Sequence, residues 1–198
     1  MQHALGQIRS EKEYFHQLDV DEIDEMRRHG AAKARRLQMA QACQTQDEPI
    51  LSALERLGYD PDTVRLLHLV PLLHVAWVDG SISRAERECI LAIASRRGVE
   101  ESSPAYRQLI AWLHWPPSEE FFEGTLCSIR AILRLQSAEE RRASTETLIH
   151  RCREVAFASC GPFEWRNRIC IFKRRLIKEI GKRLDFGDQG TTAVVTGA

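Results

Sequence analysis

Two carboxylates flank a short turn near the middle of the chain. Asp79 precedes Gly80, and Glu86 follows at the start of the next apolar stretch. Carboxylates and turn carbonyls are the oxygen ligands that Ca²⁺ and Mg²⁺ prefer. The segment is not an EF-hand loop, because Arg84 stands at the sixth position, which requires glycine, and Ile90 at the twelfth, which requires Glu. We therefore expect any bound Ca²⁺ or Mg²⁺ to be held weakly by Asp79 and Glu86.

The same residues also have a purely structural interpretation. Ser83 and Glu86 are three positions apart, which is the spacing of a helix capping box. Asp79 can accept a hydrogen bond from the backbone of its own turn. The sequence leaves the metal and the capping interpretations open.

Cysteine and histidine are the other residue types that could support catalysis. The chain has 6 cysteines and 7 histidines, without a C-x-x-C or an H-E-x-x-H pattern. The wide cysteine spacing inside apolar runs favours buried, reduced thiols. Cys160 lies near a turn, but at a predicted helix C-terminus, whose dipole disfavours a thiolate. Because no serine or cysteine has a nucleophile-elbow or P-loop setting, we predict that the protein is not an enzyme.

The last apolar stretch of the chain is strongly basic. Its cations are Arg166, Arg168, Lys173, Arg174, Arg175, Lys178, Lys182 and Arg183. The interleaved apolar residues are Ile169, Phe172, Leu176, Ile177 and Ile180. This amphipathic pattern is typical of a helix that binds an anionic membrane surface or nucleic acid. A solvated helix face gives the same pattern.

A third interpretation of the basic stretch is internal pairing. Residues 11–25 carry seven acidic residues and a single basic one, Lys12. Opposite charge blocks of this kind attract one another. The two segments would then meet within one chain or between two copies in a homodimer.

Helical periodicity surrounds all of these features, and no strand pattern competes with it, so we predict an all-α fold. The expected helices are 18–43, 48–57, 61–78, 83–97, 104–114, 118–135, 138–159 and 166–186. The stretch Leu66–Val78 is apolar almost all round and should be the central helix, with a kink near Pro71. Histidines and Pro71 interrupt it, and it is too short to span a bilayer.

The chain divides into three expected parts. Residues 1–60 should form an N-terminal helical extension, 61–186 a helical domain, and 187–198 a disordered tail. The first ten residues lack the apolar core of a signal peptide. The net formal charge of zero argues against a polyanion binder over the whole chain, and the reduced thiols favour a cytoplasmic protein.

The segment from His74 to Glu86 reads HVAWVDGSISRAE, an apolar helix that ends in Asp-Gly, followed by a short turn and a helix with Glu on its first turn. It resembles the signature of the TerB-like (tellurite-resistance) helical domain family. The resemblance implies a helical bundle with two helix-turn-helix repeats. It also implies a non-enzymatic interaction module in a bacterial stress-response or envelope setting, with an unknown protein partner, in the cytoplasm or at the inner membrane.

The second repeat is degenerate in this chain. Residues 154–161 parallel residues 74–80, and residues 169–181 parallel residues 82–94. Ser159 or Cys160 stands in place of Asp79, and Lys173 stands in place of Glu86. Because a lysine repels a metal, we expect any specific metal site at the first repeat only.

Overall fold

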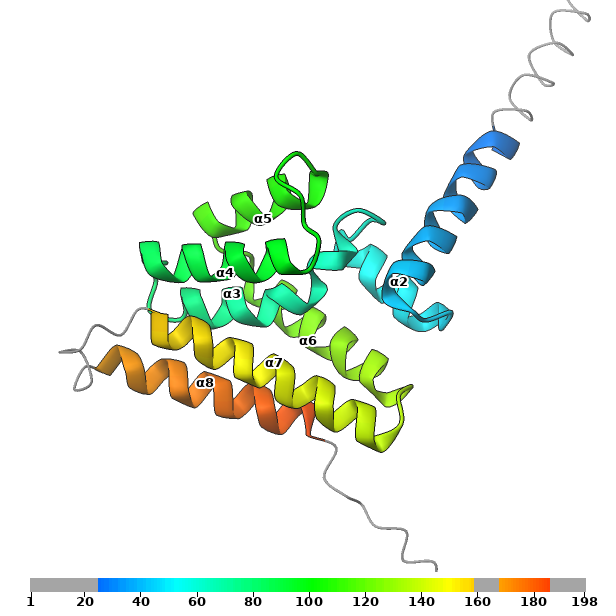
Figure 1. The fold of residues 1–198 in the computed structure, drawn as a ribbon. Helices are drawn as coiled ribbons and strands as arrows, with labels where there is room; N and C mark the ends of the chain where they lie inside the picture. Colours follow the sequence, from blue (N-terminus) through cyan, green and yellow to red (C-terminus); the bar gives the residue numbers. More distant parts are fainter. Residues whose placement is uncertain (1–24, 159–167, 186–198) are drawn as a thin grey trace, which may run out of the picture.

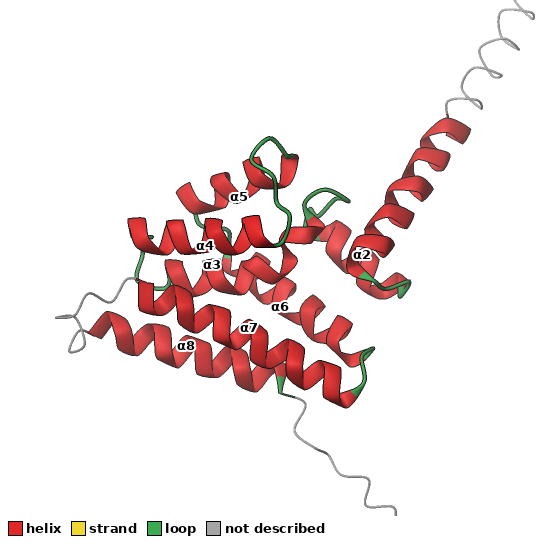
Figure 2. Cartoon of the chain, in the orientation of Figure 1, coloured by secondary structure: helices red, strands yellow, loops and turns green. Residues whose placement is uncertain are grey.

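The computed structural model describes residues 25–158 and 168–185, and all regular structure within these ranges is helical (Figures 1 and 2). The all-α prediction is confirmed for this part of the chain. After a helix at 25–43 come α2 (Glu48–Arg56), the 3₁₀ helix η1 (Val64–Leu69), α3 (Val70–Trp77), α4 (Arg84–Arg96), α5 (Pro104–His114), α6 (Glu119–Arg134), α7 (Ala138–Ala158) and α8 (Arg168–Leu184). Residues 187–198, the expected tail, lie outside the described ranges.

Local capping explains why these helices begin where the sequence predicts. The side chains of Asp47, Ser83, Ser103 and Ser118 each accept a hydrogen bond from a backbone N–H of the first helical turn. Gly80 adopts φ +88°, a left-handed conformation that lets the chain reverse after α3.

The centre of the bundle is formed by η1 and α3, and α3 contacts α4, α6, α7 and α8. Leu69, Leu73, Ala76 and Ile90 are at most 1% exposed, which confirms their predicted burial. The expected single kinked helix is wrong in one respect. The 3₁₀ helix ends at Leu69, and α3 begins at Val70, so Pro71 lies in the first turn of α3. A backbone N–H in the first turn has no partner within the helix, so the proline removes no helical hydrogen bond there.

The two helices α7 and α8 lie side by side and run in opposite directions along one face of the bundle (Figure 1). α8 also contacts α3 and α6, so its inner side faces the central helix. None of the described helices combines the length and apolar character that crossing a membrane requires.

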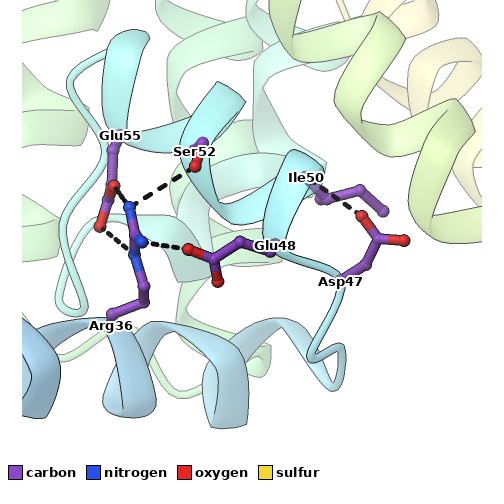
Figure 3. Close-up of polar contacts among 6 residues, drawn as sticks. All are labelled: Arg36, Asp47, Glu48, Ile50, Ser52 and Glu55. Carbon is purple, nitrogen blue, oxygen red and sulfur yellow. Dashed lines mark hydrogen bonds and ion pairs between the residues drawn. The ribbon is translucent and has the colours of Figure 1, made fainter.

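The helix of residues 25–43 projects from the bundle like an arm (Figure 1). Its buried residues, Met39 and Ala40, lie near the end that meets the bundle. Arg36 anchors this arm to α2 through ion pairs with Glu48 and Glu55, as Figure 3 shows. The arm confirms the predicted helix 18–43 over its described part, whereas residues 18–24 lie outside the described ranges.

Candidate functional site

The turn between α3 and α4 contains the predicted capping box. Ser83 Oγ accepts a hydrogen bond from the Glu86 backbone N–H at 3.2 Å. In return, Glu86 Oε2 accepts hydrogen bonds from Ser83 N at 3.0 Å and from Ser83 Oγ at 2.8 Å. Asp79 Oδ1 also accepts a 3.4 Å hydrogen bond from Ser81 N in its own turn. The capping interpretation of these residues is therefore confirmed.

A third residue, which the sequence did not associate with this turn, joins the two carboxylates. Lys173 of α8 places its Nζ 2.9 Å from Asp79 Oδ2 and 2.5 Å from Glu86 Oε1. The Lys173 and Glu86 side chains are each 1% exposed, and that of Asp79 is 15% exposed. We call these three residues the ion cluster. It ties α8 to the start of α4.

The electrostatics of the ion cluster favour a charged Lys173. Burial by itself would lower the pKa of the ammonium group, but hydrogen bonds and charge attraction from Asp79 and Glu86 outweigh burial, and the pKa is raised above its ordinary value of 10.5. Glu86 uses one carboxylate oxygen for Ser83 and the other for Lys173. The same carboxylate thus serves as helix cap and as ion-pair partner.

The ion cluster also bears on the expected Ca²⁺ or Mg²⁺ site. Asp79 and Glu86 already share the ammonium of Lys173 as a counter-ion. Within residues 25–158 and 168–185, no group of three or more His, Cys, Asp or Glu side chains is placed to hold a metal. A divalent ion at this turn would have to displace the ammonium, so metal binding stays a prediction to be tested against that competition.

The burial of Lys173 corrects its predicted place among the surface cations of α8. Lys173, Ile177, Ile180 and Leu184 are all buried and follow one another at spacings of four, three and four residues. Phe172, one of the apolar residues of the expected amphipathic pattern, is 51% exposed. Adjacent residues point about 100° apart around a helix. Because Lys173 faces the interior, its neighbour Phe172 points toward solvent. The spacing was visible in the sequence, but a lysine there could not be distinguished from a surface cation.

The predicted basic surface is only partly formed. Arg174, Arg175, Lys178 and Lys182 are exposed on α8. Lys173 does not belong to this surface, because it is buried in the ion cluster. Arg183 is half-buried and forms ion pairs with Glu123 of α6 and Glu179 of its own helix. Arg168 begins α8, whereas Arg166 lies outside the described residues.

A groove runs between α7 and α8 and encloses about 520 Å³. Three of its lining residues are cations: Arg153, Arg174 and Lys178. The other lining residues are uncharged: Ile149, Ala156, Phe157, Ile177 and Gly181. Phe157 is 58% exposed, so its side chain presents apolar surface at the groove. We call this feature the α7–α8 groove; it combines an apolar lining with positive charge.

His68, His74 and Cys152 lie in or near the core. Burial, assisted by the charge of Arg97, lowers the pKa of His68 to about 4, so its ring is neutral at physiological pH. His74 stacks on Phe122 with ring centroids 4.3 Å apart. Burial raises the pKa of the Cys152 thiol to about 12, which makes it a poor nucleophile. Cys160 lies outside the described residues.

Comparisons with family models, curated proteins and solved structures find no match to this chain. The TerB-like resemblance therefore stands on the segment His74 to Glu86 and its degenerate repeat. The α7–α8 groove and the ion cluster are the two features of the described residues that bear on function.

Proposed function

We propose that this chain is a non-enzymatic helical interaction module of the TerB-like kind, whose α7–α8 groove binds an acidic, partly apolar segment of a protein partner. The observation that supports this proposal is the lining of the groove, which sets Arg153, Arg174 and Lys178 around apolar side chains. A bacterial stress-response or envelope setting, as the resemblance implies, is part of the proposal.

The chemistry of the groove selects for such a partner. Apolar walls favour burial of apolar side chains, and Phe157 offers a large contact surface. The cations favour carboxylates and disfavour basic segments, which gives selectivity and faster association. A volume of about 520 Å³ accommodates a few side chains of a helix or an extended segment, rather than a folded domain.

The ion cluster has a positioning role in this proposal. Lys173 is fixed by Asp79 and Glu86, and its neighbour Arg174 lines the groove. Ile177, one turn further along α8, lines the groove as well. By fixing α8 at Lys173, the cluster holds one wall of the groove in place, so a partner need not order it on binding.

A second candidate function is peripheral binding to an anionic membrane. Ile171 and Phe172 are 63% and 51% exposed at the start of α8, next to the exposed cations Arg174 and Arg175. Apolar side chains beside cations are typical of surfaces that insert into the headgroup region. We rank membrane binding second, because a lipid surface needs a projecting face. The cations Arg153, Arg174 and Lys178 instead line a groove.

Photo-crosslinking inside cells that express this protein tests the leading proposal. A photoreactive residue replaces Phe157 in the full chain, with and without the double substitution Arg174→Glu/Lys178→Glu. We expect a discrete protein adduct, whose crosslinked peptide is acidic, that disappears when the groove charges are reversed. The matched control carries Arg107→Glu/Arg142→Glu, which reverses two exposed charges outside the groove, and it should retain the adduct.

Three outcomes would contradict the proposal. They are no adduct at position 157, an adduct that persists after groove reversal, and a crosslinked peptide that is basic or neutral. Co-sedimentation of the full chain with vesicles of anionic and of neutral phospholipid tests the second candidate. Binding to anionic vesicles that is lost in Ile171→Ser/Phe172→Ser, without a protein adduct at position 157, would favour the membrane.

A further inference from the structure

We infer that the α7–α8 groove of one copy receives the acidic segment of residues 11–25 from a second copy of this chain. The inference rests on the proposed function, because it names the partner segment for the same groove. Its support comes from the charge of the two surfaces, from the direction of the arm, and from the apolar side chains that the arm exposes.

The acidic segment has the chemistry that the groove selects. Seven of its residues are acidic and one, Lys12, is basic. Phe15, Leu18 and Ile23 are interleaved with these acids, so the segment offers apolar side chains as well as charge. The groove offers the complement, with Arg153, Arg174 and Lys178 around an apolar lining.

The arm carries the attachment point of this segment away from the groove of its own chain (Figure 1). The arm begins at residue 25, and its N-terminal end points away from α7 and α8 (Figure 1). The helix of residues 25–43, at about 1.5 Å per residue, carries that end about 27 Å from residue 43 along its axis. Arg36 fixes the direction, because its guanidinium pairs with Glu48 and Glu55 of α2 (Figure 3). The groove of another copy is therefore the more accessible one.

The arm itself shows a surface that a second copy could cover. Met26 and Leu37 are 70% and 57% exposed along it. A projecting helix that buries little of its surface is marginal in water without a packing partner. A copy that accepts the acidic segment would lie beside the arm and shield these side chains, which adds apolar burial to the charge attraction.

The contact is between two different surfaces, the segment and the groove. Two copies that exchange segments reciprocally would close a dimer, whereas one-way exchange would build longer chains. Because the contact relies on charge, it should weaken as salt rises from about 50 mM to about 500 mM, where the Debye length falls well below about 10 Å.

Solution mass by light scattering, at tens of micromolar chain and low salt, tests the inference with full-length variants. We expect the parent to self-associate. The groove variant Arg174→Glu/Lys178→Glu and the segment variant Asp21→Lys/Asp24→Lys should each be monomeric. An equimolar mixture of these variants should form a heterodimer, because the first retains an intact segment and the second an intact groove. The control Arg107→Glu/Arg142→Glu should behave like the parent.

Other outcomes overturn the inference. A parent that is monomeric under these conditions, or one whose self-association survives both reversals, excludes the exchange. A mixture that stays monomeric when both single variants are monomeric shows that segment and groove do not bind each other across copies. Circular dichroism of each variant at the same concentration verifies that the fold is retained.

The inference and the proposed function fail in different ways. If position 157 crosslinks to an acidic peptide of another protein while the parent stays monomeric, the groove is a docking site but its partner is foreign. If position 157 gives no adduct and the chain is monomeric, both ideas fail. A crosslinked peptide from residues 11–25 of this chain supports both.

Discussion

Glu86 and Lys173 lie 87 positions apart in the chain, and their side chains meet at 2.5 Å in the interior. Glu86 lies in the first turn of α4, and Lys173 lies on α8, at the positions that correspond in the two helix-turn-helix repeats we expected. The pair combines an anion with a cation, so the two side chains attract each other across the bundle. The ammonium thus supplies the positive charge that a metal ion would otherwise bring to the two carboxylates.

The first prediction concerns the loss of that ammonium. Lys173→Met should lower the free energy of unfolding by about 3–5 kcal/mol, because it leaves Glu86 buried without its counter-ion. Urea denaturation at neutral pH measures the change. Lys182→Met, on the exposed side of the same helix, is the control and should stay within about 0.5 kcal/mol of the parent. If Lys173→Met is equally mild, the ion cluster does not hold α8.

The Glu86→Gln background sharpens this test. A glutamine side chain would keep a hydrogen-bonding group but no charge, so removing Lys173 should cost less there than in the parent. We expect a coupling free energy of about 1 kcal/mol or more between the two substitutions. Strict additivity would show that the 2.5 Å contact contributes no specific attraction.

A titration with metal ions tests the Ca²⁺ or Mg²⁺ hypothesis directly. Since the ammonium of Lys173 already lies between Asp79 and Glu86 and offsets part of their charge, calorimetric titration of the parent should give no binding heat at millimolar Ca²⁺ or Mg²⁺. Lys173→Ala should open a weak site, because it frees both carboxylates and some space, and adding Asp79→Asn should abolish it. Binding to the parent that is lost in Asp79→Asn would instead establish the metal site.

Acid stability follows from His68. Its pKa is lowered to about 4 in the folded protein by burial and by Arg97, against an ordinary 6.5. Between these values the unfolded chain binds a proton that the folded protein does not, so stability falls as pH drops from 6.5 to about 4 and levels off below. The shift corresponds to a loss of about 3 kcal/mol. His68→Gln should remove most of this loss in urea titrations at about pH 7, 5 and 4; an unchanged pH profile would contradict the assignment.

The helices could be predicted well because their signals are local. Asp47, Ser83, Ser103 and Ser118 cap helices at the expected starts, and such capping depends on residues two or three positions away. The central segment was less predictable. Pro71 indicated a disturbance, but the choice between a kink and a 3₁₀-to-α junction depends on how α3 packs against its neighbours.

Only two of the three residues of the ion cluster could be predicted to lie together. Asp79 and Glu86 are visible as a pair because they share one turn. The sequence pattern groups Lys173 with the basic surface, because its neighbours Arg174 and Arg175 are cations and a buried lysine is rare. Its true environment depends on the packing of α8 against the start of α4, which brings together residues far apart in the chain. The α7–α8 groove could not be predicted for the same reason.

The binding of a labelled acidic peptide to the groove tests the central claim most directly. The probe is a fluorescent peptide with the sequence of residues 8–26, added to the full-length Asp21→Lys/Asp24→Lys variant, whose own segment no longer competes. We predict saturable binding by fluorescence anisotropy that weakens at least tenfold in the same chain carrying Arg174→Glu/Lys178→Glu, and not in one carrying Arg107→Glu/Arg142→Glu. Equal affinity for all three chains would contradict the assignment of the α7–α8 groove as the docking site.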